Sequence, residues 1–124
     1  MNVTCGTDII EVERIKYALE KLGETFLNKI YTKNEIEYCM SKNNMKYQHL
    51  AARFAAKEAI FKAISHLLDD KFQITWTDVE IYNDENGKPQ VRFLNNKPEK
   101  IKQIDISMSH IEDYATANCV VVTK

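Results

Sequence analysis

The stretch RFAAKEAIFKA, residues 53–63, decides the fold because it lies within an uninterrupted helical segment. Neither glycine nor proline occurs from Leu50 to Leu68, and good helix formers dominate, which predicts a long helix over 50–68. At about 100° per residue, one broad arc of the helix carries large apolar side chains: Leu50, Phe54, Ile60, Phe61, Ile64, Leu67 and Leu68. A second arc carries only small side chains, which would let a helix or a sheet approach closely: Ala52, Ala56, Ala59 and Ala63.

Four charged side chains lie within or beside the apolar arc of this helix. Arg53 and Lys57 fall inside the apolar arc, and Glu58 and Lys62 lie along its border. Because an unpaired buried charge is costly, we expect them to face a polar, partly enclosed site. Three cations suggest a phosphate, and a carboxylate among them suggests a bridging metal ion. The alternative is structural: Glu58 and Lys62 form an ordinary pair four residues apart, and the other two cations snorkel.

The whole chain has the composition of one soluble globular domain covering residues 1–124. Its residues are 44% hydrophobic and 28% charged, with only two prolines. The net charge of −1 provides no general basic field, so we expect no nucleic-acid binding and only a local anion site. We expect no membrane association, because the chain has no apolar run long enough to span a bilayer.

Three cysteines indicate the redox environment. Cys5, Cys39 and Cys119 are odd in number, widely spaced and without a Cys-x-x-Cys motif. This pattern favours reduced thiols over a disulfide framework or a zinc site. We therefore expect a cytoplasmic protein.

The order of predicted elements indicates the fold class. We expect helices at residues 12–22, 26–30, 32–40 and 50–68. We expect strands at residues 3–10, 72–82, 90–94, 104–110 and 115–122. Gly23 is a plausible helix stop, Thr32 and Glu35 match a capping box, and residues 83–89 form a turn that makes a hairpin. The fold class is therefore α+β, with an antiparallel sheet packed on one long helix plus shorter helices.

Several motifs outside the long helix are weak when taken singly. Asp8 ends a strand, where an aspartate is most often a helix cap or a solvated residue, and His110 is by default a core histidine. Their order and spacing together resemble the bacterial holo-[acyl-carrier-protein] synthases, the small 4'-phosphopantetheinyl transferases. The matching motifs are Gly6-x-Asp8 with Glu11-x-x-Arg14, Arg53-Phe54-Ala55-Ala56-Lys57-Glu58-Ala59, Trp76-x-Asp78-x-Glu80, Asn86-Gly87-Lys88-Pro89, and Ser107-x-Ser109-His110 with Tyr114-Ala115.

This resemblance implies a phosphoryl transfer for fatty-acid synthesis. The 4'-phosphopantetheine arm of coenzyme A would move to a serine of apo acyl carrier protein, and adenosine 3',5'-bisphosphate would leave. Asp8 and Glu58 match the family's Mg²⁺ ligands, and Lys62 would neutralise the pyrophosphate as the third catalytic residue. Either Glu58 or a metal-bound water would take the serine proton. The resemblance does not distinguish Mg²⁺ from Mn²⁺.

The remaining functional assignments also follow from the resemblance. Coenzyme A would be bound by Arg53, Lys57, Gly87, Lys88, Pro89, Ser109 and His110, and the alternative for Arg53 or Lys57 is a contact with the carrier protein. Arg14 and Lys21, seven residues apart on the first helix, would contact an acidic carrier protein, although nearby glutamates dilute this basic patch. Ile111 stands where the family often has a hydroxyl, and Ile10 where larger relatives have a third acidic ligand. The resemblance further implies a homotrimer with active sites between subunits.

Two other functions compete with this one. A non-catalytic module that binds coenzyme A or a carrier protein would not need the pair Asp8 and Glu58. A nucleotide-phosphate hydrolase is a weaker alternative, because the chain has neither a Walker-type glycine-rich loop nor a cluster of histidine and aspartate ligands.

Overall fold

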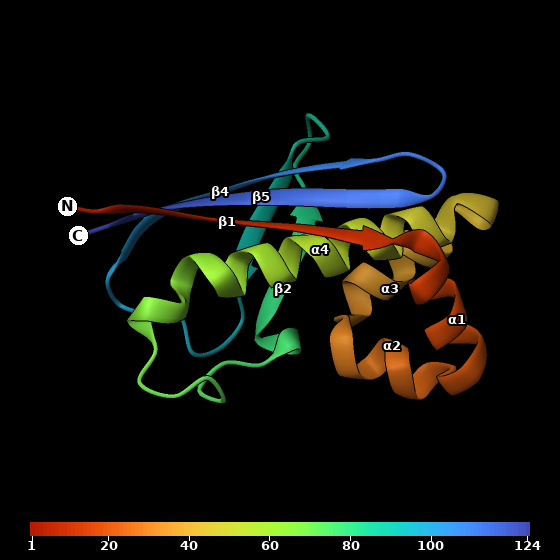
Figure 1. The fold of residues 1–124 in the computed structure, drawn as a ribbon, viewed down its shortest axis with the longest axis horizontal. Coiled ribbons are helices and arrows are strands. Elements are labelled where there is room, and N and C mark those ends of the chain that lie inside the picture. Colours follow the sequence, from red (N-terminus) through yellow and green to blue (C-terminus); the bar gives the residue numbers. More distant parts are fainter.

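The helix α4 (Lys46–Ile64) forms the axis of the fold, and a three-stranded antiparallel sheet lies across it (Figure 1). The computed structural model describes residues 1–124. The strands run in the order β1 (Val3–Glu11), β5 (Tyr114–Thr123) and β4 (Ile101–His110). The predicted long helix is confirmed, but it starts earlier and ends earlier than 50–68. Residues predicted to end the long helix instead form the 3₁₀ turn η2 (Ser65–Leu67). Another 3₁₀ turn, η1 (Asn43–Met45), directly precedes α4.

A close approach between β1 and α4 fixes the position of the sheet. A Cβ atom added to Gly6 would lie 2.0 Å from the carbonyl oxygen of Ala59, so only glycine fits there. The Thr4 hydroxyl donates a hydrogen bond of 2.7 Å to the carbonyl oxygen of Ala63. The arc of small side chains on the helix is therefore used by the sheet at Ala59 and Ala63, whereas Ala52 belongs to a second core cluster formed mainly by helical residues.

Three short helices cover one end of α4 (Figure 1). They are α1 (Val12–Leu22), α2 (Glu24–Ile30) and α3 (Lys33–Met40). The predicted capping box is present, since the Thr32 hydroxyl accepts from the Glu35 amide and Glu35 accepts from the Thr32 amide. Gly23 ends α1 with a φ of 57°, a conformation that favours glycine. Sequence pattern thus located all three helices to within two residues.

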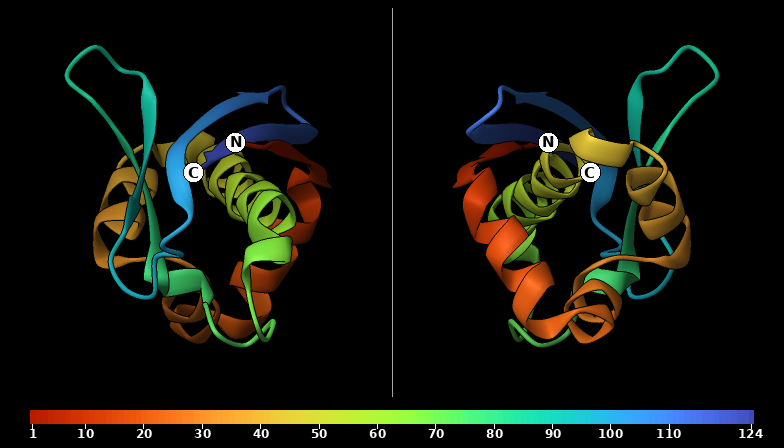
Figure 2. Two further views of the ribbon diagram at one scale, coloured as in Figure 1. Left: turned by 90° about the vertical axis from the view of Figure 1, so that its left-hand side faces the viewer. Right: turned by 90° about the vertical axis from the view of Figure 1, so that its right-hand side faces the viewer.

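The remaining strands form a separate two-stranded sheet rather than extending the first. It is the hairpin β2 (Val79–Asn83) and β3 (Pro89–Phe93), whose turn projects from the body of the molecule (Figure 2) while the start of β2 is buried. The prediction of a strand from residue 72 is wrong, because residues 76–78 form the 3₁₀ turn η3 (Trp76–Asp78). A capping box between Thr75 and Asp78 stabilises that turn.

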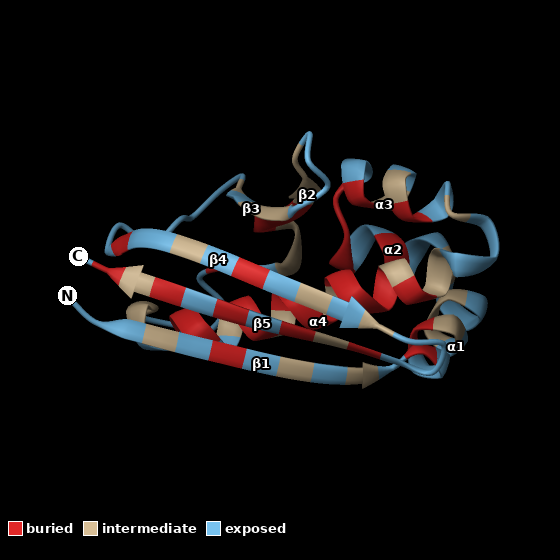
Figure 3. Cartoon of the chain, turned by 90° about the horizontal axis from the view of Figure 1, so that it is seen from above, coloured by how far each residue is buried: buried red, intermediate tan, exposed pale blue.

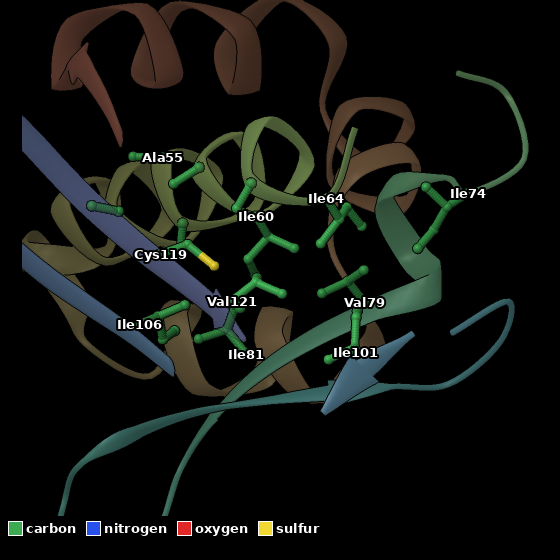
Figure 4. Packing of buried hydrophobic residues seen from close by; sticks show 14 residues of the cluster. Ala55, Ile60, Ile64, Ile74, Val79, Ile81, Ile101, Ile106, Cys119 and Val121 are labelled. Atoms are coloured by element: carbon green, nitrogen blue, oxygen red, sulfur yellow. The ribbon is translucent and has the colours of Figure 1, made fainter. Parts of the chain in front are cut away.

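The main core lies between α4 and the three-stranded sheet, and the hairpin closes it (Figure 4). Ile60, Val79 and Val121 are fully buried there. The opposite face of the sheet has no second layer, and its strands alternate between buried and exposed residues (Figure 3). Ile9 is 67% exposed on that outer face, and Val120 is 44% exposed. No helix of the chain has the length and apolar character needed to cross a membrane.

Candidate functional site

The first group of predicted site residues meets where β1 passes α4. Asp8 follows Gly6 by two residues, so its side chain lies on the same, helix-facing side of the strand. Lys62 Nζ lies 3.2 Å from Asp8 Oδ1 and donates to the Thr7 carbonyl oxygen at 2.9 Å. Partial burial raises the pKa of Glu58, the nearby Asp8 carboxylate raises it further, and Lys62 acts in the opposite direction. The structure therefore brings Asp8, Glu58 and Lys62 together.

Two neighbouring carboxylates, one of which raises the pKa of the other, suit a hard divalent cation. Mg²⁺ takes oxygen ligands, usually keeps several waters, and often uses only one or two protein carboxylates. No group of three or more histidine, cysteine, aspartate or glutamate side chains is arranged to hold a metal. The donor set of Asp8 and Glu58 thus fits a Mg²⁺ ion that shares its coordination sphere with substrate and water, and fits a fully protein-enclosed metal poorly.

Lys62 also borders a cavity beside α4. This cavity has a volume of about 800 Å³ and extends from Lys62 between α4, α2 and the loop after α4. Phe61, Leu68 and Trp76 contribute to its apolar wall, and Lys29 and Lys71 add two further cations. A ligand with its phosphate at Lys62 could therefore continue into a largely apolar pocket of the size that small-molecule sites have.

The second group surrounds Arg53 and includes two residues that the sequence analysis missed. The Arg53 guanidinium lies 4.3 Å from the ring centre of Tyr38, and its buried Nε has no hydrogen-bond partner. The rings of His49 and His110 are 5.3 Å apart, and His49 also contacts Tyr38. Burial, Arg53 and His110 lower the pKa of His49 to about 4. Cationic and imidazole groups with an unsatisfied donor make this region suitable for an anion.

A signal for His49 was present in the sequence. It precedes Arg53 by four residues, which places both side chains on one face of a helix. Tyr38 belongs to α3, and nothing in the local sequence indicates that it packs against Arg53. Its contribution depends on how α3 folds back on α4, which is tertiary information.

The two groups lie on opposite sides of α4. Arg53 and Lys62 are nine residues apart, which corresponds to a rotation of about 180° around a helix. Arg53 accordingly faces α3, whereas Lys62 faces the edge strand β1. One chain therefore does not present both groups to a single small molecule.

Lys57 requires a correction. The family resemblance implies that it binds coenzyme A phosphates, but its side chain is fully buried. Its Nζ lies 2.7 Å from Glu35 Oε1 and donates to the carbonyl oxygens of Ile30 and Trp76, each at 2.8 Å. These three contacts use all three ammonium protons. Burial lowers the pKa of Lys57, and the Glu35 carboxylate opposes that effect. Lys57 is thus a core residue and is not available to a phosphate.

Of the predicted nucleotide residues of the hairpin, Gly87 and Lys88 are exposed and Pro89 is half-buried. Gly87 has a φ of 81° at the turn, and Pro89 begins β3. Lys88 Nζ forms an ion pair of 2.8 Å with Asp105 on β4, and that hydrogen bond lowers the pKa of the Asp105 carboxyl. The hairpin tip is therefore linked to β4 rather than to β1.

The two adjacent β4 residues assigned to nucleotide binding point to different faces. Ser109 is exposed on the outer face of the sheet, whereas His110 faces α3 and α4 beside His49. Within one chain they do not converge on one group.

The predicted carrier contacts lie on the exposed surface of α1. Arg14 is paired with Glu11 at 3.3 Å, with both side chains more than half exposed. Lys21 lies 5.7 Å from the ring centre of Tyr17, which is itself 62% exposed. Tyr17 is a further candidate contact that the charge pattern did not indicate, because aromatic side chains often anchor protein interfaces.

Comparison with known proteins gives a consistent family. The sequence model of the 4'-phosphopantetheinyl transferase superfamily matches residues 4–119. The chain is 46% identical over 122 residues to the holo-[acyl-carrier-protein] synthase of Protochlamydia amoebophila, covering 97% of this chain and 98% of that protein. A relative of the same name from Ruminiclostridium cellulolyticum is 44% identical, covering 98% and 92% of the two chains.

Solved structures agree with the sequence comparison. A holo-(acyl-carrier-protein) synthase from Bacillus anthracis in complex with CoA (3',5'-ADP) matches with a TM-score of 0.80 and 31% identity, covering 98% of this chain and 96% of that chain. The Helicobacter pylori holo-[acyl-carrier-protein] synthase in complex with coenzyme A matches with a TM-score of 0.83 and 26% identity, covering 95% and 99%.

Proposed function

The chain belongs to the 4'-phosphopantetheinyl transferase superfamily, and we propose that it is a Mg²⁺-dependent holo-[acyl-carrier-protein] synthase of fatty-acid synthesis. It would transfer the 4'-phosphopantetheine arm of coenzyme A to a serine of apo acyl carrier protein and release adenosine 3',5'-bisphosphate. The convergence of Asp8, Glu58 and Lys62 carries this proposal, because these are the residues that phosphoryl transfer needs at the pyrophosphate.

The reaction exchanges a phosphoanhydride bond of coenzyme A for a phosphodiester bond to the carrier. The carrier serine oxygen forms a bond to the β-phosphorus of coenzyme A, and the bridging pyrophosphate bond breaks. The serine proton passes to a base, and the α-phosphate leaves with the adenosine half. Asp8 and Glu58 would hold Mg²⁺, which supplies charge neutralisation at the pyrophosphate oxygens.

Lys62 has two features that suit the leaving group. Its ammonium is positioned by the Asp8 carboxylate and the Thr7 carbonyl oxygen, yet its side chain remains 54% exposed and accessible to a ligand. A positioned cation stabilises charge that develops on a leaving phosphate. Since Lys62 also borders the apolar cavity, we propose that the pantetheine arm extends from Lys62 into that cavity.

The adenosine half would contact the other group of residues. Arg53, His49 and His110 provide an unsatisfied donor and imidazoles for the 3'-phosphate. Gly87, Lys88 and Pro89 of the hairpin would lie near the adenine, and Ser109 would provide a hydroxyl to a phosphate from the outer face of the sheet.

A homotrimer would unite these separated groups. Arg53 and Lys62 lie on opposite sides of α4, so one coenzyme A contacts both groups only if they come from two copies of the chain. The uncovered outer face of the sheet, with Ile9 and Val120 exposed, offers the apolar surface that a subunit interface requires. We therefore propose active sites between neighbouring subunits.

The carrier protein would dock on α1, where Arg14, Lys21 and Tyr17 are exposed. Basic side chains steer an acidic partner, and the aromatic ring supplies contact area. We place the reaction in the cytoplasm, since the three cysteines are free thiols and fit a reducing compartment.

Intact-mass spectrometry tests this function directly. Apo acyl carrier protein incubated with this protein, coenzyme A and Mg²⁺ should gain the mass of one phosphopantetheine group, and EDTA should abolish the gain. If titration calorimetry shows coenzyme A binding but no carrier gains mass, the protein is a binding module and the transferase proposal fails.

A further inference from the structure

Lys57 joins three segments that are separate in sequence. Its Nζ contacts the end of α2 through the Ile30 carbonyl oxygen, the start of α3 through the Glu35 carboxylate, and the turn η3 through the Trp76 carbonyl oxygen. Glu35 extends this connection, since its second oxygen accepts a 2.7 Å hydrogen bond from the Ile81 amide of β2. A buried ion pair with all its hydrogen bonds satisfied fixes the relative positions of its partners.

Among these partners, Trp76 is the residue that also lines the cavity beside Lys62. Its indole stacks on Phe54 with ring centres 5.0 Å apart and meets Phe61 edge-on at 5.2 Å. The same side chain lines the cavity that begins at Lys62. The turn that carries it has only three residues, and Lys57 is the side chain that binds its first carbonyl oxygen.

We propose that Lys57 is a positioning residue that holds Trp76 in the wall of this cavity and thereby sets the affinity for the arm of coenzyme A. The inference rests on the proposed function, in which the arm extends from Lys62 into the cavity. Lys57 itself touches no substrate. Its effect reaches the ligand through the Trp76 backbone and the stacked ring.

This role predicts an effect on one half of the ligand only. Adenosine 3',5'-bisphosphate lacks the arm, so its affinity should not depend on the cavity wall. Coenzyme A contains the arm, so its affinity should. A residue that only stabilises the fold would not distinguish the two ligands.

The experiment compares dissociation constants for coenzyme A and adenosine 3',5'-bisphosphate by titration calorimetry in wild type and Lys57→Met. We expect coenzyme A binding to weaken about tenfold, the effect of losing one hydrogen bond from a charged donor, with the bisphosphate unchanged. Trp76 is the only tryptophan, so its fluorescence reports the wall directly. Coenzyme A should change this fluorescence in wild type and change it less in Lys57→Met.

Two further variants keep the test decisive. If Lys57→Met does not fold because it strands the Glu35 charge, the double variant Lys57→Met with Glu35→Gln removes both charges and should show the same ligand-selective loss. Glu80→Gln is the matched control. Glu80 is also buried and binds Thr32 and Arg92, but it makes no bond to Trp76.

The inference is overturned if Lys57→Met weakens both ligands equally or neither, or if Glu80→Gln reproduces the loss. Its failure is distinguishable from failure of the proposed function. A wild-type protein that loads no carrier refutes the transferase proposal, whereas the ligand comparison still reports whether Lys57 controls the cavity.

Discussion

Lys57 and Lys62 belong to one helix and each pairs with one carboxylate, yet they differ in solvent exposure and in the side of the helix they occupy. The pair of Lys57 and Glu35 is closed to solvent, whereas the side chains of Lys62 and Asp8 are 54% and 18% exposed. Five residues separate the lysines, a rotation of about 140° around the helix. The comparison teaches that the enclosed pair organises the fold and the open pair leaves a cation accessible to a substrate.

The largest expected effect concerns the carboxylate beside the open pair. Glu58→Gln should reduce carrier modification by about a hundredfold or more, because a neutral amide binds Mg²⁺ weakly and does not neutralise its charge. The measurement is the initial rate of carrier mass gain at saturating coenzyme A and Mg²⁺. Glu37→Gln, an exposed glutamate on α3, is the control and should keep the wild-type rate. A folded Glu58→Gln protein with full activity would refute the assigned role of Glu58.

The second prediction compares the stability contributions of the two lysines. Lys57→Met should lower the free energy of unfolding by about 3–5 kcal/mol, because it leaves the Glu35 charge buried without a partner. Lys62→Met should change it by less than about 1 kcal/mol, since solvent screens the pair with Asp8. Urea denaturation of both variants, followed by circular dichroism, measures the difference. Equal losses in the free energy of unfolding would show that the pair of Lys57 and Glu35 does not stabilise the fold more than the pair of Lys62 and Asp8.

The same two lysines show what sequence could and could not predict. The helix, the capping box of Thr32 and Glu35, and the hairpin turn follow from local pattern, and the structure confirms them. The error over Lys57 arose because a helical wheel shows that a side chain faces inward but not which partner meets it. Glu35 was recognised only as a capping residue, and its contact with Lys57 requires the packing of α3 on α4.

The functional site was also predictable from sequence only in part. Asp8, Glu58 and Lys62 were predicted from motif resemblance, and Gly6 explains physically why they meet. The separation of Arg53 from Lys62 follows from helix geometry once the neighbours of each face are known. The turn η3 was mistaken for strand because alternating residues outweighed the Thr75 and Asp78 capping box. Consequently Trp76 was not expected to line a cavity.

The smallest expected effect tests whether the two lysines have separate electrostatic environments. Lys62 lowers the pKa of Glu58 against the raising effects of burial and Asp8, whereas the Lys57 ammonium is paired with Glu35 in the core. Removing the positive charge in Lys62→Met should therefore raise the pKa of Glu58 further, and Asp8→Asn should lower it. Carbon-13 NMR titration of the Glu58 carboxyl measures both changes in metal-free protein.

The sign of this shift determines a pH dependence. A carboxylate must be ionised to bind a metal cation, so protons compete with Mg²⁺ at pH values below the pKa of Glu58. Because that pKa is raised, Mg²⁺ affinity should still increase with pH above the range of an ordinary carboxyl, and in Lys62→Met the increase should move to higher pH. Folded Lys57→Met should titrate like wild type. If it shifted Glu58 as much as Lys62→Met does, the buried pair would be part of the electrostatics of the active site, and the distinction between the enclosed and the open lysine would fail.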